Sequence, residues 1–248
     1  MPKYNLLNSN SKLAKLSGKK YLIAGLTIAP HSLGGVNVCP SAGACRAVCN
    51  LWFAGRTVTE PVRNAMLRRK ELMFADPDRF RELLCDDVAR FERTATRKGL
   101  IPLLRPNVAS DLDYSWLARE FPGVTCYDYS KVRGRLALAK RPDWPTNYHI
   151  TYSYSERSHH RTVGAWLNSG HNVAVVFSTA YNPQHHVIGK LPRTWRVDGS
   201  ERDVIDGDAH DICLPEVDGR GVIRGLRFKG GRKRMARAIE SGFVVDAG

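Results

Sequence analysis

Leu100-Ile101-Pro102-Leu103-Leu104-Arg105 is the first of four similar apolar segments in this sequence, and the other three begin at Val124, Asn147 and Asn172. The segments recur about every 24 residues, which is the length of one β-strand, one α-helix and two loops. Strands connected in this way lie parallel, with right-handed crossovers. The repeat therefore predicts an α/β protein with a parallel sheet.

Further strands and helices extend this pattern in both directions. An earlier apolar segment occupies residues 21–28, and two later ones lie near 203–206 and 221–228. About seven strands suit a partial or distorted parallel β/α barrel in a single domain. A doubly wound sheet is the alternative, although no G-x-G-x-x-G or P-loop motif occurs. Apolar side chains at helical spacing predict helices at 61–74, 77–97, 113–121, 131–140, 159–169 and 231–240. The polar and basic residues 1–20 are expected to form an N-terminal arm, and residues 21–248 the barrel-like domain.

A cysteine-rich loop at residues 34–50 follows the first predicted strand. Three of the six cysteines, Cys39, Cys45 and Cys49, lie within it with C-x5-C-x3-C spacing. A helix beginning at Cys45 would place Cys45 and Cys49 on one face. Thiolates bind soft metals, and the small residues between these cysteines let backbone amides approach sulfur. We expect the three to hold an iron–sulfur cluster of the four-iron type, with Cys213 as the best candidate for a fourth ligand. A zinc ion, or buried thiols without a metal, are the alternatives.

Polar side chains follow each strand of the repeat. Because loops at the carboxyl ends of parallel strands surround one crevice, we expect a site for a polar substrate there. The predicted substrate contacts are Arg105, Asn107, Tyr129, Tyr154 and Glu156. The candidate catalytic residues are Asp111, Asp128, Lys131 and Asp208. Basic side chains there would bind anions, aromatic rings would stack a base, and the aspartates would accept protons or hold magnesium. Helix capping is the alternative for each of these loops.

The charge of the chain indicates a partner. It has 38 Lys and Arg against 24 Asp and Glu, a formal net charge of +14, spread along the whole length. A field of this sign favours polyanions, and nucleic acid, DNA or RNA, is the commonest one in a cytoplasm. A surface made basic only for solubility is the alternative. No apolar run reaches about 18 residues, and the first residues lack the apolar core of a signal peptide, so we expect a cytoplasmic protein that does not contact a membrane.

Several short patterns carry a family resemblance. They are Asn8 to Lys12, Cys39 to Cys49, Ser110-Asp111, Tyr127 to Lys131, Asp206 to Asp211 and Gly225 to Gly230. In these patterns the sequence resembles the "gene product eighty-eight"-like proteins of phages and mobile elements. It is also distantly similar to radical S-adenosylmethionine-type β/α barrels, which carry a cysteine loop after the first strand. The spacing departs from their usual C-x3-C-x2-C, and Val48 stands where they have an aromatic residue before the third cysteine.

Two hypotheses of function follow. The first is an iron–sulfur protein of a phage or mobile element that binds or acts on nucleic acid. Its enzymatic versions are a magnesium-dependent nuclease and a radical S-adenosylmethionine-like enzyme. The second is a non-enzymatic binder in which a structural zinc fixes a loop and the basic surface holds DNA or RNA. The sequence leaves open whether the protein is an enzyme, and which substrate it takes.

Overall fold

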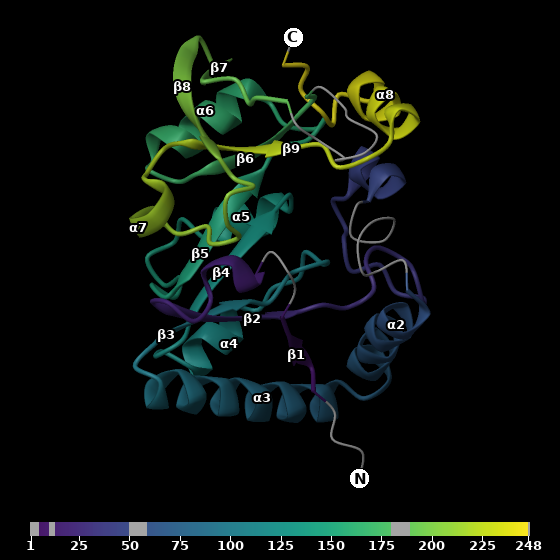
Figure 1. The fold of residues 1–248 in the computed structure, drawn as a ribbon, viewed down its shortest axis with the longest axis vertical. Helices are drawn as coiled ribbons and strands as arrows, with labels where there is room; N and C mark the ends of the chain where they lie inside the picture. The colour runs from purple at the N-terminus through teal and green to yellow at the C-terminus, as the bar shows by residue number, and fades with distance from the viewer. Residues whose placement is uncertain (1–4, 10–12, 50–58, 180–188, 248) are drawn as a thin grey trace. The chain divides into compact units, whose positions relative to one another are not determined.

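The computed structural model describes residues 5–9, 13–49, 59–179 and 189–247. Its strands follow the order β1-β2-β3-β4-β5-β6-β9-β8-β7 (Figure 1). The strands are β1 (Leu7–Asn8), β2 (Tyr21–Leu26), β3 (Ile101–Arg105), β4 (Thr125–Ser130), β5 (Tyr148–Ser153), β6 (Val173–Phe177), β7 (Thr194–Val197), β8 (Ser200–Asp206) and β9 (Ile223–Arg227). The helices are η1 (Leu13–Leu16), η2 (Gly43–Val48), α2 (Glu60–Ala75), α3 (Pro77–Arg97), α4 (Ser115–Glu120), α5 (Arg133–Leu138), α6 (His160–Asn168), α7 (Pro215–Asp218) and α8 (Arg232–Glu240).

The four apolar segments form strands. β3, β4, β5 and β6 each begin one residue after the start that the repeat predicts. β2 pairs with β3, β3 with β4, β5 with β6, and β6 with β9, all in parallel. Antiparallel pairs, β1 with β2 and β7 with β8, occupy the two ends of the strand order. The prediction of a mixed α/β fold with mostly parallel strands is confirmed.

The pairings of the described strands do not close a barrel. The strand order has two ends, β1 and β7, and these are not paired with each other. The order also departs from the sequence. β9 pairs with both β6 and β8, although the chain reaches it after β8. Ile223, the first residue of β9, lies opposite Val173 on one side and Val204 on the other. A sequence pattern lists the strands in chain order, and it does not predict that a late strand pairs between two earlier ones.

The chain divides into two compact units. Unit 1 contains Met1–Pro40, Arg56–Asp128 and Ala137–His149. Unit 2 contains Ser41–Gly55, Tyr129–Leu136 and Ile150–Gly248. The division passes through the cysteine-rich loop, so that Cys39 belongs to unit 1 whereas Cys45 and Cys49 belong to unit 2.

The long helix α3 supports the strands of unit 1, where it contacts β1, β2 and β3. Phe80, Leu84 and Val88 are buried on its inner face at helical spacing. Asp76 separates α3 from α2, and its carboxylate accepts a hydrogen bond from the backbone N–H of Arg79 at 3.0 Å. Proline occupies the first position of α3, where no N–H is needed. The predicted break between the two helices is therefore confirmed.

The described part of the N-terminal arm is packed rather than loose. Leu6 and Leu13 are fully buried. The carboxylate of Asp87 on α3 accepts hydrogen bonds from the backbone N–H groups of Leu6 at 2.6 Å and Leu7 at 3.1 Å. The segment is polar overall, so its composition alone predicts an arm. A few buried leucines nevertheless attach it to unit 1.

In unit 2, α6 contacts β6 and β7, and α8 contacts η2. The buried side chains that hold α8 are Val48, Phe228, Met235, Ala238, Phe243 and Val244. η2 corrects one prediction, because the segment that begins at Gly43 is a 3-10 helix that ends at Val48. Cys49 follows it with a non-helical backbone, so the α-helical spacing expected to align Cys45 with Cys49 is absent. No helix among the described residues is both long and apolar enough to cross a membrane.

Candidate functional site

A buried network in unit 1 surrounds Asp128. This carboxylate is fully buried within β4 and accepts hydrogen bonds from the backbone N–H of Asn107 at 2.9 Å, from Asn107 Nδ2 at 2.6 Å and from the Tyr148 hydroxyl. Asn107 Oδ1 in turn accepts from Ser110 Oγ at 2.7 Å and from the backbone N–H of Leu112 at 2.9 Å. These bonds fix the loop after β3. The role that the contacts support for Asp128 is to hold this loop, and its catalytic role stays a prediction.

The same loop is tied to the segment that carries Cys39. The backbone N–H of Asp111 donates to the carbonyl of Val38 at 2.8 Å. Cys39 Sγ accepts a hydrogen bond from the backbone N–H of His31 at 3.3 Å and donates to the carbonyl of Ala109 at 3.5 Å. Cys39 is therefore a partly exposed thiol whose sulfur already has backbone partners within unit 1.

A buried lysine completes this part of unit 1. Lys70, on α2, is fully buried, and its ammonium donates to the carbonyls of His31 at 2.7 Å and Leu33 at 2.5 Å. Burial lowers the pKa of Lys70, whereas the neighbouring Cys39 raises it. Sequence reasoning missed this lysine, because it follows two arginines, Arg68 and Arg69, in a basic helix.

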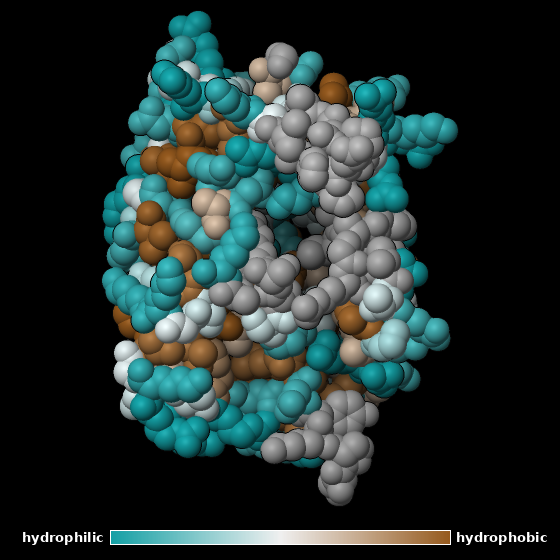
Figure 2. Space-filling model, in the orientation of Figure 1, coloured by the Kyte–Doolittle hydropathy of each residue, from teal (hydrophilic) through white to brown (hydrophobic). Residues whose placement is uncertain are grey.

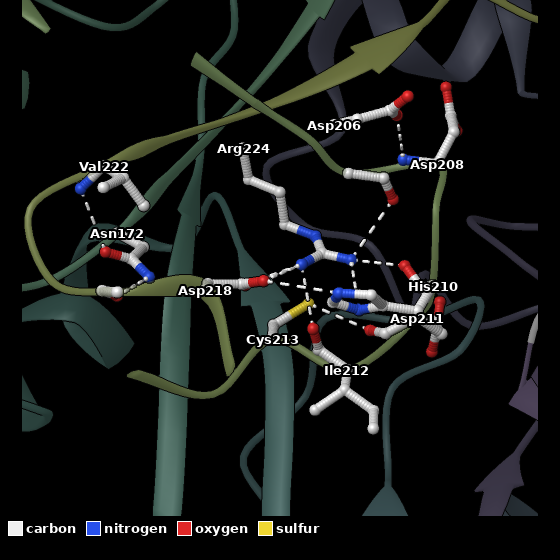
Figure 3. Close-up of polar contacts among 12 residues, drawn as sticks. Asn172, Asp206, Asp208, His210, Asp211, Ile212, Cys213, Asp218, Val222 and Arg224 are labelled. Carbon is white, nitrogen blue, oxygen red and sulfur yellow. Dashed lines mark hydrogen bonds and ion pairs between the residues drawn. The ribbon is translucent and has the colours of Figure 1, made fainter. Parts of the chain in front are cut away.

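A buried ion pair dominates the strand ends of unit 2 (Figure 3). Arg224, the second residue of β9, is fully buried, and its Nη1 lies 2.6 Å from both carboxylate oxygens of Asp218. The same guanidinium donates to the carbonyls of Ile212, Gly207 and His210, and its Nε donates to the Tyr129 hydroxyl at 2.9 Å. The guanidinium thereby fastens the loop after β8 onto β9.

Electrostatics maintain the charge of Arg224. Burial alone would lower its pKa, but Cys213, Tyr129 and Asp218 together raise it. Tyr129, predicted to contact a substrate, is thus a partner of a buried arginine. Cys213 is also buried there, and its thiol donates to the carbonyl of Asp211 at 3.1 Å.

Asp208 lies in a second cluster, and Figure 3 shows its carboxylate pointing away from Arg224. Its Oδ1 lies 2.6 Å from Lys229 Nζ and its Oδ2 3.4 Å from Arg227 Nη1. Asp206 pairs with the same Arg227 nitrogen at 2.9 Å. Burial opposes ionisation of Asp206, but the hydrogen bond from Arg227 lowers its pKa. Two carboxylates and two cations therefore neutralise one another at the ends of β8 and β9.

Lys131 and Glu156 lie at the ends of β4 and β5. Lys131 Nζ donates to Ser153 Oγ at 2.8 Å and lies 5.6 Å from the centre of the Phe243 ring. Glu156 Oε1 accepts a hydrogen bond from the backbone N–H of Ala44 at 3.0 Å. That contact anchors η2, and with it Cys45, to the end of β5.

The predicted site residues are thus divided between the units. Unit 1 holds Arg105 and Asn107 with Asp111 and Asp128. Unit 2 holds Tyr129, Lys131, Tyr154, Glu156 and Asp208. Of the predicted residues, direct hydrogen bonds join Asn107 with Asp128. A cavity of about 230 Å³ lies beside β1, β2 and α3 in unit 1, and none of the predicted site residues lines it.

The predicted cluster ligands are divided between the units, with Cys39 in unit 1 and Cys45, Cys49 and Cys213 in unit 2. Within the described part of the chain, no group of three or more His, Cys, Asp or Glu side chains is placed to hold a metal ion. Cys213 lies against Arg224 instead, in a setting that the sequence did not reveal. The iron–sulfur cluster and its ligands therefore stay a prediction, and we derive no chemistry from it.

Together, the mostly parallel sheet and the polar residues at its strand ends define an α/β protein with two buried polar networks. A family model described as Gene product 88 matches residues 4–247, and the chain belongs to that family. The resemblance found in the short sequence patterns is confirmed. Searches of curated proteins and of solved structures gave no match. The family match carries no activity with it.

Proposed function

We propose that this protein binds nucleic acid through the exposed basic face of α8, defined as Arg232, Lys233 and Arg237. One observation carries the proposal. All three side chains are exposed, and none forms an ion pair with a carboxylate of the described residues. Met235 and Ala238, on the opposite face, are buried against the core of unit 2. The charges are thus presented by a helix that is held in place.

Three of the basic residues of α3 differ in this respect. Arg79 pairs with Glu82 at 2.9 Å, Arg81 lies 4.0 Å from Glu120, and Arg90 pairs with Asp87. In Figure 2, most of the visible surface over α3 and α8 is hydrophilic. Pairing with carboxylates reduces the positive field around these three arginines, whereas the basic face of α8 keeps its charges available to phosphates.

Phosphate binding by these side chains has a measurable signature. Each basic group that neutralises a phosphate releases condensed counterions, so affinity falls as salt rises. The loss of three such contacts lowers the slope of log affinity against log salt by about 2 on a single strand and by nearly 3 on a duplex. The slope separates direct phosphate contacts from a general loss of positive charge.

The test compares two triple variants of the full chain. The first is Arg232→Gln, Lys233→Gln, Arg237→Gln. Its matched control is Arg93→Gln, Arg97→Gln, Lys98→Gln, at exposed positions at the end of α3. Both remove three positive charges. Fluorescence anisotropy with a labelled oligonucleotide over a salt series should show a reduced slope for the α8 variant alone. Equal losses in the two variants would leave only a net-charge effect and overturn the proposal.

A second proposal concerns the predicted carboxylate chemistry of Asp208, at the ends of β8 and β9. Asp206 forms an ion pair with Arg227, and Asp208 forms ion pairs with Arg227 and Lys229. Turnover of an oligonucleotide that is abolished by Asp208→Asn, with binding retained, would support a nuclease. Binding without turnover supports the non-enzymatic reading, in which the polar networks fix loops.

A further inference from the structure

Three aromatic rings form a cluster in unit 2 that the sequence did not reveal. We call Tyr154, His160 and Trp195 the aromatic platform. The ring centres of Tyr154 and Trp195 are 5.1 Å apart, those of His160 and Trp195 5.3 Å, and those of Tyr154 and His160 6.1 Å. All three pairs are edge-to-face, with interplanar angles of 65 to 82°. Tyr154 OH and His160 Nε2, at 3.3 Å, further fix the two rings.

The exposure of these rings is unusual for a packing cluster. His160 is exposed, and Tyr154 and Trp195 are partly exposed. Another edge-to-face pair of the same unit, Tyr152 with Trp166, is buried to 5% and 3% exposure. Unit 2 therefore contains a core aromatic pair and, separately, an aromatic cluster that water reaches. Packing in the core explains the pair Tyr152 and Trp166. It does not explain why the rings of the aromatic platform are exposed to water.

Basic side chains border the platform. Arg161 follows His160 in the first turn of α6 and is exposed. Arg193 is exposed and continues the ladder of β7, since its carbonyl accepts a hydrogen bond from the backbone N–H of Val204 at 2.9 Å. Residues two apart on a strand share a face, so Arg193 lies on the face of Trp195, whereas Arg196 lies on the other.

The platform connects with the core that supports α8. The Phe177 ring lies 6.2 Å from Trp195, and the carbonyl of Phe177 accepts from the backbone N–H of Phe228 at 3.1 Å. Phe228 is one of the buried residues packed under Met235 of α8. The aromatic platform and the basic face of α8 are thus connected through Phe177 and Phe228 within one unit.

We propose that the aromatic platform stacks an unpaired base, which makes single-stranded nucleic acid the preferred ligand of this protein. The proposal rests on the function proposed above and specifies its ligand. A base stacked on an aromatic side chain contributes about 1–3 kcal/mol, and every base offers such a face. In a duplex both faces of each base are covered by neighbouring base pairs. The platform therefore discriminates strandedness, while the α8 face binds phosphates of either form.

The experiment measures binding of labelled oligo-dT, oligo-rU and a DNA duplex of the same length to full-length variants. Trp195→Leu keeps apolar packing on Phe177 and removes the stacking surface, whereas Trp195→Phe keeps an aromatic ring. We expect Trp195→Leu to lower single-strand affinity by about 5- to 150-fold and to leave duplex affinity unchanged. Trp195→Phe should retain most of the single-strand affinity. The oligo-dT and oligo-rU arms show whether DNA or RNA is bound more tightly.

Two further variants change exposed residues, so that packing inside unit 2 is left unchanged. His160→Ala should weaken single-strand binding selectively, and Arg193→Gln should weaken it more than Arg196→Gln on the opposite face of β7. Equal effects on single strands and duplex, or no effect of His160→Ala and Trp195→Leu in folded protein, would overturn the platform while the α8 interface stands. Absence of salt-dependent binding to any of the three oligonucleotides would overturn both proposals.

Discussion

Asp218 and Arg224 form an ion pair at 2.6 Å in which the two side chains are 1% and 0% exposed. Removing one partner of such a pair leaves a buried charge uncompensated, which costs about 3–5 kcal/mol. The guanidinium also binds three backbone carbonyls, so its loss frees acceptors as well.

We therefore expect Arg224→Met to lower the free energy of unfolding by about 3 kcal/mol or more. The control is Arg141→Met, which removes an ion pair with Asp143 whose side chains are 60% and 65% exposed. That change should cost much less, because an exposed ion pair is weak. Urea denaturation followed by circular dichroism measures both. Similar costs for the two variants would show that Arg224 does not fasten the loop after β8.

The Asp128 network gives a prediction that separates structure from catalysis. Asp128→Asn replaces one acceptor oxygen by a donor that faces Asn107 or Tyr148, so we expect a loss of about 1–3 kcal/mol of stability. Tyr148→Phe removes a single donor and should cost less, about 0.5–1.5 kcal/mol. The urea midpoints of the two variants measure this. Full stability of Asp128→Asn combined with loss of a turnover would instead favour the catalytic prediction for Asp128.

Much of the fold follows from the sequence because parallel strands between covering helices are continuous apolar runs. The four segments from Leu100 to Phe177 illustrate this. β7 was not predicted because Trp195 lies in a short strand next to Pro192 and between two arginines, without regular alternation. The place of β9 escaped because the partners of a parallel strand are chosen across long separations, which local patterns do not record.

The sequence predicted which residue types occur near the strand ends better than it predicted their contacts. Asn107 and Lys131 do follow the ends of β3 and β4, and Asp128 lies within β4, but hydrogen bonds join all three to residues of their own unit. Arg224 carried a usable signal, an arginine within an apolar strand with Asp218 six residues earlier. Since a buried charge requires a partner, this pairing can be inferred from sequence in other chains.

A glycine offers a test of how η2 is anchored. Gly43 has φ of +52°, and a Cβ there would lie 2.0 Å from Glu156 Oε1, the atom that accepts from Ala44. Gly35→Ala is the control, because Gly35 has φ of +107° and open space around its Cβ position.

Both substitutions add backbone strain, of about 1–2 kcal/mol in the left-handed region, but only Gly43→Ala should also displace Glu156. Hydrogen exchange of the Ala44 amide reports this directly. We expect faster exchange in Gly43→Ala and an unchanged rate in Gly35→Ala. Unchanged exchange in both would show that Glu156 does not secure η2.

The iron–sulfur cluster predicted from Cys39, Cys45 and Cys49 is open to a direct measurement. Protein purified without oxygen should show broad visible absorption with matching iron and sulfide if the cluster forms, and Cys45→Ala should abolish it. Cys85→Ala, in α3, should not. Colourless protein with one zinc would instead support the structural-metal alternative, and protein with neither would end the metal hypothesis.

The position of β9 between β6 and β8 has a consequence for incomplete chains. Ile223 and the residues after it supply the partner groups for two parallel strands at once. A chain that stopped before residue 223 would leave β6 and β8 each with an unpaired edge, separated by the width of one strand. Such edges recruit strands from other molecules. Truncated forms of this protein are therefore expected to aggregate, and a synthetic peptide with the sequence of β9 should suppress that aggregation.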